Sequence, residues 1–168
     1  MKRIMPSIIA GLLTFCVVYA VNTGETPKAP EEIPATEKTE PKYTDEDAEA
    51  LAIIIYQEAG ADNIQDYVRE YVGCVVLNRV ESERFPDTIE EVATEKAQWG
   101  LLHWTGLQWP ERARLPEEAY AVERARMCAK KLLEMDTRPV PVDVLYCAEF
   151  QQGEIWKHEH NIYFCKGE

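Results

Sequence analysis

The segment DYVREYVGCVVLNRV, residues 66–80, constrains the fold more than any other part of the chain. Its apolar residues do not form a single stripe, because they surround most of the circumference of an α-helix. A helix that is apolar on nearly every side has to be covered on nearly every side by other elements. The segment is therefore predicted to be the buried central helix of a helical core.

Capping residues predict two further helices. Thr44, with an aspartate three residues later, has the spacing of a capping box and precedes an apolar run that ends near Gly60. Thr88, with a glutamate three residues later, repeats this spacing and is predicted to open a short helix over residues 89–97.

The last part of the chain combines one long helix with strand-like segments. The helix is predicted to have Pro116 in its first turn and to end at about Met135. The segments VDVLYCAEF and IWKHEHNIYFC then flank QQGE, and they are predicted to form a β-hairpin with Gly153 in its turn. Helices first and a hairpin last indicate an α+β fold that is predominantly helical.

The N-terminus has the composition of a targeting segment. Lys2 and Arg3 precede a mostly apolar run, Ile4–Val21, which is typical of an export signal or a membrane anchor. A signal cut after Ala20 and a tether retained through residues 4–21 are equally open. In either case we expect an extracytoplasmic protein, either secreted or anchored to the cytoplasmic membrane.

Composition divides the rest of the chain into a linker and one domain. Residues 22–43 are rich in Pro, Glu, Thr and Lys and are predicted to be a solvated linker between the leader, residues 1–21, and the folded part. Residues 44–168 are long enough for one domain with its own core. The net charge of −12 argues against nucleic acid as a partner.

Four cysteines follow the leader, and an exported protein with an even number of them permits disulfides. Cys74 lies within the apolar helix and is predicted to be a small core residue. Cys147 and Cys165 lie on neighbouring strand-like segments, and they are the pair most expected to form a disulfide.

Glu58 is the residue that most suggests chemistry. It follows the unbroken apolar run LAIIIY and falls on the same side of a helix as Leu51, so its carboxyl group is expected to face the core. Burial of an ionised carboxylate is costly, and the pKa of Glu58 is therefore expected to be raised. A carboxyl group that keeps its proton beside an apolar pocket is what acid-catalysed cleavage of a glycosidic bond requires. The structural alternative is a glutamate at the end of the helix whose side chain turns out to water or forms an ion pair with a buried arginine such as Arg79.

Four motifs strengthen the chemical interpretation. YQEA, GCVVLNRV, RFPDTIEEV and AQW follow one another at separations that resemble the bacterial cell wall hydrolase family, which includes the spore cortex-lytic enzymes. The resemblance covers about Leu51 to Trp99, and the hairpin supports it weakly. It implies a fold similar to lysozyme and the lytic transglycosylases, and a substrate that consists of the glycan strands of peptidoglycan.

The resemblance places the catalytic glutamate of the family at Glu58, within its Y-x-E-A motif. Two positions depart from the usual pattern. The family commonly continues E-A-R-G-E, whereas this chain has Gly60 in place of the arginine and Asp62 in place of the second glutamate. It also commonly shows N-H-x-F near the end, where this chain has Ile162 in place of the histidine.

Two reaction types are compatible with this glutamate. A hydrolase needs a second carboxylate, for which Asp62, Asp87 and Glu149 are available. A lytic transglycosylase, as the resemblance implies, needs Glu58 alone and cleaves the bond between N-acetylmuramic acid and N-acetylglucosamine. We expect transglycosylation, because no second carboxylate has a comparably apolar sequence context.

Several polar and aromatic residues are candidates for holding the glycan, each with a structural role as the alternative. They are Asn78, Gln98, Trp99, Tyr146 and Tyr163. No cofactor and no metal ion is expected.

Two other functions remain open. His158 and His160, predicted to face the same side of one strand, are a weak signal for a zinc-dependent amidase. The departures from the family pattern and the acidic charge would also suit a degenerate domain that binds peptidoglycan without cutting it.

Overall fold

The computed structural model describes residues 42–96, 99–100 and 102–167. The predicted leader and nearly all of the predicted linker lie outside these residues. Within them, no helix has both the length and the apolar character needed to cross a membrane.

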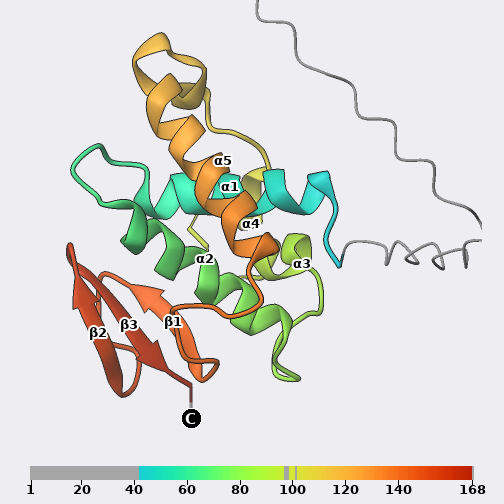
Figure 1. Cartoon of the computed structure of the whole chain (residues 1–168), viewed down its shortest axis with the longest axis vertical. Helices are drawn as coiled ribbons and strands as arrows, with labels where there is room; N and C mark the ends of the chain where they lie inside the picture. Colours follow the sequence, from blue (N-terminus) through green and yellow to red (C-terminus); the bar gives the residue numbers. More distant parts are fainter. Residues whose placement is uncertain (1–41, 97–98, 101, 168) are drawn as a thin grey trace, which may run out of the picture. The chain divides into compact units, whose positions relative to one another are not determined.

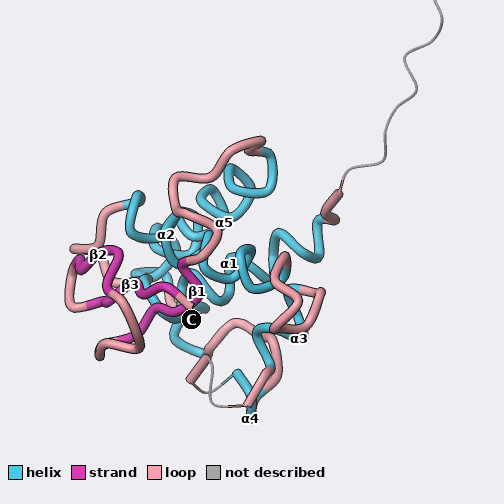
Figure 2. The backbone as a smooth tube through the Cα atoms, turned by 90° about the horizontal axis from the view of Figure 1, so that it is seen from below, coloured by secondary structure: helices cyan, strands magenta, loops and turns pink. Residues whose placement is uncertain are grey.

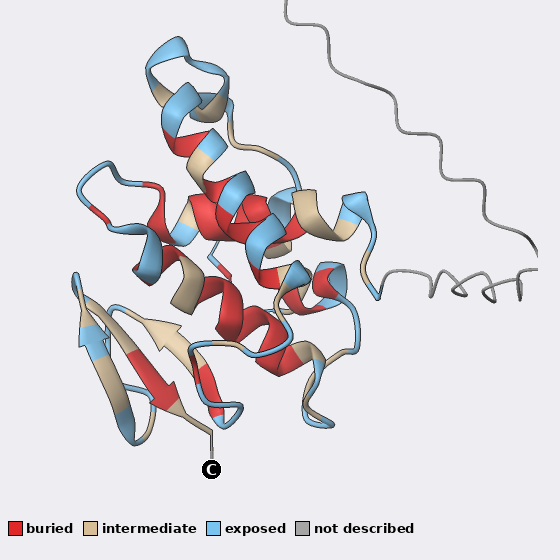
Figure 3. Cartoon of the chain, viewed as in Figure 1, coloured by how far each residue is buried: buried red, intermediate tan, exposed pale blue. Residues whose placement is uncertain are grey.

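Two helices confirm the capping and periodicity arguments. Helix α1 spans Asp45–Ala59, and the Thr44 hydroxyl accepts a hydrogen bond from the backbone N–H of Asp47 at 3.1 Å, while the Asp47 carboxylate accepts one from the N–H of Thr44 at 2.9 Å. Helix α2 spans Asp66–Val80 and is buried along most of its length. Figure 3 shows both helices at the buried centre of the domain.

Helix α5, Ala119–Glu134, packs against both α1 and α2 (Figure 1). Gly73 of α2 lies against Ile55 of α1 and Leu132 of α5. A methyl group at this position would collide with both side chains. A 3-10 turn, η2 at Pro116–Glu118, precedes α5, so the predicted long helix begins three residues later than expected.

Short elements connect α2 to α5. Helix α3, Ile89–Thr94, has the predicted Thr88 cap but ends three residues early, because Glu95 adopts an extended conformation. Helix α4, Leu102–Thr105, and the 3-10 helix η1, Glu111–Arg114, follow between α3 and η2.

The C-terminal region forms a three-stranded antiparallel sheet beside the helices (Figure 2). Its strands are β1 (Val144–Ala148), β2 (Ile155–Glu159) and β3 (Ile162–Lys166), in the order β1-β3-β2. The α+β prediction is confirmed. The predicted position of the hairpin turn is wrong.

The tight turn lies at His160 and Asn161 and not at Gly153. Both residues have positive φ, at 46° and 67°, which matches the twist of a two-residue hairpin turn. The segment IWKHEHNIYFC therefore folds back on itself as β2 and β3, and Gly153 lies in the connection from β1 to β2. His158 and His160 consequently do not share a strand.

The predicted disulfide between Cys147 and Cys165 is not formed, and the four described cysteines are free. Cys147 is opposite Phe164 and Cys165 is opposite Tyr146, so the register places these two cysteines on alternate faces of the sheet. Cys74 is fully buried, which confirms its predicted place in the core.

Candidate active site

Glu58 lies in the last turn of α1, and its side chain is exposed. The prediction that its carboxyl group faces the core is therefore wrong. The rest of this turn is buried, because Tyr56 and Ala59 are inaccessible to solvent. The helix thus leaves the core at Glu58 and presents a single carboxyl group at the surface.

Two hollows meet at this carboxyl group, and both are lined by Gln57, Glu58 and Ile64. The first, which we call the helical hollow, has a volume of about 480 Å³ and is bordered by residues that follow α1 and by η1 and η2. Its remaining charged residues are Asp62, Arg112, Glu117 and Glu118.

The second, which we call the sheet hollow, has a volume of about 250 Å³ and lies between α1, α2 and the sheet. Cys147 and Glu149 from the end of β1 line it together with residues of the β2–β3 turn. Glu58 is therefore the charged group that the two hollows have in common.

The surroundings of Glu58 favour its protonated form. Burial raises the pKa of the Glu58 carboxyl group above its usual value, the negative charge of Glu149 raises it further, and the positive charge of Arg79 partly opposes both. Exposure and a raised pKa are compatible, because solvent reaches the group through the hollows while protein encloses its other sides. A raised pKa is the property expected of a general acid.

Arg79 is buried and forms no ion pair among the described residues. Its Nε donates to the carbonyl of Leu145 at 2.7 Å, and its guanidinium lies 4.8 Å from the ring centre of Trp99 and 5.0 Å from that of Phe85. The alternative of a Glu58–Arg79 salt bridge is not observed. Arg79 acts on Glu58 only through its charge.

Asn78 and Arg79 fasten the sheet to α2. The Asn78 amide nitrogen donates to the carbonyls of Pro141 at 2.8 Å and Val144 at 3.0 Å, and Arg79 adds the bond to Leu145. These three bonds fix the start of β1. The other end of β1 lines the sheet hollow. Both residues are almost fully buried.

Comparison with known proteins identifies the family of the chain. The family model described as Cell Wall Hydrolase matches residues 65–166, which is more than half of the chain. The chain belongs to the cell wall hydrolase family. This is the family of the spore cortex-lytic enzymes, and membership supports a role in the degradation of peptidoglycan.

Glu58 lies seven residues before the matched region, so the match itself does not assign a role to it. No curated protein and no solved structure matches the chain.

The other predicted glycan-binding residues of this cell wall hydrolase are dispersed. Asn78 and Trp99 are buried, Tyr146 packs edge-on against Phe85, and Tyr163 stacks on His158 with ring centres 3.9 Å apart. In the described part of the chain, none of these four predicted residues lines either hollow. The fifth candidate, Gln98, lies outside the described residues.

The cell wall hydrolase has site residues that the sequence argument did not single out. Arg112 and Glu118 reach the helical hollow from η1 and η2. Tyr56 links them to α1, because its hydroxyl donates to Glu118 at 2.7 Å and its ring lies 5.0 Å beneath the Arg112 guanidinium. Burial and Glu118 raise the pKa of Tyr56 to about 12, so its hydroxyl keeps the proton that it donates.

The histidine and cysteine signals receive no support as catalytic sites. His160 hydrogen-bonds Gln65 from the β2–β3 turn, and no group of three or more candidate ligands for a metal ion occurs within the described ranges. Burial raises the pKa of the Cys147 thiol to about 12, so the thiol is not a ready nucleophile although it lines the sheet hollow.

Proposed function

We propose that the chain is a lytic transglycosylase that cleaves the bond between N-acetylmuramic acid and N-acetylglucosamine, with Glu58 as its single general acid and base. The observation that carries the proposal is the position of Glu58. It has a raised pKa and lies where two hollows meet, so a glycan strand bound across both would place a glycosidic bond beside it.

In the first step, protonated Glu58 donates its proton to the glycosidic oxygen, and the bond from this oxygen to C1 of the muramic acid breaks. The resulting Glu58 carboxylate then accepts the proton of the muramic acid 6-hydroxyl group while that oxygen bonds to C1. The products are a free hydroxyl on the leaving sugar and an anhydro-muramyl end. The buried charge of Arg79 favours the carboxylate form that the second step requires.

Glu149 favours hydrolysis as a second candidate. It lines the sheet hollow with Glu58 and is close enough for its charge to raise the pKa of Glu58. A second carboxylate in the same hollow is the arrangement that activates water or forms a covalent intermediate in glycosidases. We expected transglycosylation because no second carboxylate has a comparably apolar sequence context, and the position of Glu149 weakens that argument.

The proposed location is outside the cytoplasm. It is supported by the basic and apolar character of residues 1–21 and by a cell wall substrate, which lies beyond the membrane.

Digestion products test the proposed reaction. Full-length protein is incubated with purified peptidoglycan, and the soluble fragments are identified by mass spectrometry. Anhydro-muramyl ends are expected. Reducing ends alone would replace transglycosylation by hydrolysis, and binding to the polymer without soluble fragments would contradict both.

A further inference from the structure

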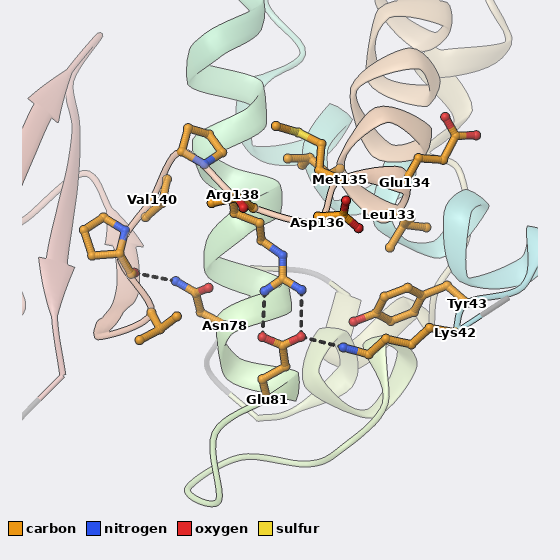
Figure 4. A pocket seen from close by; sticks show the side chains of 15 residues that line it. Lys42, Tyr43, Asn78, Glu81, Leu133, Glu134, Met135, Asp136, Arg138 and Val140 are labelled. Atoms are coloured by element: carbon orange, nitrogen blue, oxygen red, sulfur yellow. Dashed lines mark hydrogen bonds and ion pairs between the residues drawn. The ribbon is translucent and has the colours of Figure 1, made fainter. Parts of the chain in front are cut away.

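A groove of about 710 Å³ lies away from Glu58, between α2, α5 and the loop before β1 (Figure 4). Its two basic residues, Lys42 and Arg138, both donate hydrogen bonds to the Glu81 carboxylate, at 2.6 Å for the first and at 2.7 and 2.8 Å for the second. Their positive charges are therefore already matched within the protein. The helical hollow differs, because its basic residue, Arg112, forms no ion pair with a carboxylate among the described residues.

An aromatic ring holds Arg112 instead. The Arg112 guanidinium lies 5.0 Å from the ring centre of Tyr56, which is fully buried. The ring itself is well fixed, because its hydroxyl donates to Glu118 at 2.7 Å and Trp109 packs edge-on against it with ring centres 5.4 Å apart. Contact with the face of a ring holds a guanidinium without requiring its N–H donors, which lie in its plane. Arg112 can therefore offer these donors to a ligand in the hollow.

The other charged residues of the helical hollow restrict what Arg112 can bind. Asp62, Glu117 and Glu118 line the same hollow, and none of the three forms an ion pair in the described part of the chain. Three carboxylates against one guanidinium make the hollow negative, so an anionic group of a ligand would be repelled. An uncharged oxygen acceptor can bind the guanidinium without this repulsion.

The glycan strand of the proposed reaction carries an acceptor of this kind. Both of its sugars have an N-acetyl group, and the carbonyl oxygen of an amide is a stronger acceptor than a hydroxyl or an ether oxygen. We propose that the Arg112 guanidinium donates to the acetamido carbonyl of the sugar that occupies the helical hollow. Arg112 is then a residue that determines specificity for N-acetylated strands, an inference that rests on the proposed function and deepens it.

Two soluble probes of equal length test this role. They are a tetramer of N-acetylglucosamine and a tetramer of glucosamine, which lacks the acetyl groups and carries ammonium groups. Their affinities are measured by titration calorimetry with full-length Glu58→Gln protein, so that neither probe is cut. The same measurement is then made after Arg112→Met is added.

The two probes are expected to respond differently to Arg112→Met. Binding of the acetylated tetramer is expected to weaken about tenfold, because one hydrogen bond from a charged donor is lost. Binding of the glucosamine tetramer is expected to stay the same or to tighten, because a positive charge that repels its ammonium groups is removed. Equal weakening of both probes, unchanged binding of the acetylated tetramer, or no binding of that tetramer before the change would each overturn the proposal.

Arg114→Met is the matched control, because Arg114 is an exposed arginine of the same 3-10 helix and lines neither hollow. The control is expected to bind both probes like the parent protein. Cleavage does not enter these affinities, so an unchanged affinity in Arg112→Met would leave the role of Glu58 intact. Conversely, a failure of the proposed reaction would appear in the digestion products and not in the response to Arg112→Met.

Discussion

Glu58 and Glu149 interact as two negative charges in one hollow, and this interaction has a consequence for pH dependence. Glu149→Gln removes a charge that raises the pKa of Glu58, so the pKa falls and Glu58 loses its proton at lower pH. The alkaline limb of the profile of kcat/KM against pH is therefore expected to move to lower pH, while the maximal rate is largely kept.

Glu46→Gln is the matched control, because Glu46 is an exposed glutamate in the first turn of the same helix. Its profile is expected to overlay that of the wild type. A loss of about 100-fold or more for Glu149→Gln at every pH would instead make Glu149 a direct participant and favour hydrolysis.

The raised pKa of Glu58 was predictable from the sequence, but the orientation of its side chain was not. Helical periodicity predicts which residues are buried only where the neighbouring elements cover one face of the helix evenly. This condition holds within the core and fails at its edge. At the last turn of α1 the sheet and the 3-10 turns lie apart, so a position on the buried stripe opens onto the hollows. Arg112 and Glu118 reach the site from 3-10 turns, which carry no such periodicity.

At the scale of elements, the contact of α1, α2 and α5 depends on the absence of a side chain at Gly73. Gly73→Ala is expected to lower the free energy of unfolding by about 1–3 kcal/mol, because overpacking outweighs the gain in helix propensity. Denaturant unfolding measures the change. An increase in stability would show that Leu132 and Ile55 move aside without cost.

The ion cluster around Glu81 ties Lys42 and the loop before β1 to α2. Arg138 and Lys42 lower the pKa of the Glu81 carboxyl group from 4.5 to about 2. The resulting stabilisation is present above pH 4.5 and is lost as the pH falls through 2. Because the side chain is partly exposed, Glu81→Gln is expected to cost only about 1 kcal/mol at pH 7.

Thermal unfolding checks this prediction at two pH values. The difference in Tm between wild type and Glu81→Gln is expected at pH 7 and is expected to shrink towards pH 2. A difference of the same size at both values would exclude the charge as its cause.

Helix starts that are defined by local hydrogen bonds were well predicted from the sequence. The Thr44 and Thr88 caps bond residues three positions away, so the sequence alone contains the whole interaction. The sheet was less predictable, because the choice between Gly153 and His160–Asn161 as the turn depends on which strands pair. Here β3 pairs with both of the others, and strand spacing alone does not reveal this.

At the scale of the whole molecule, packing and not disulfides holds the described domain together. The four described cysteines are free, and Cys74 and Cys165 are fully buried. A reducing agent is therefore expected to leave the Tm unchanged. A fall of several degrees on reduction would reveal a disulfide and would require a different register of β1 and β3.

The proposed account as a whole depends on one carboxyl group at the junction of two hollows. The most direct test is the rate at which full-length Glu58→Gln releases soluble fragments from peptidoglycan, with Glu46→Gln as the control and circular dichroism to verify folding. The account predicts a loss of at least about 100-fold for Glu58→Gln and none for the control. Release by a folded Glu58→Gln protein at the wild-type rate would contradict it.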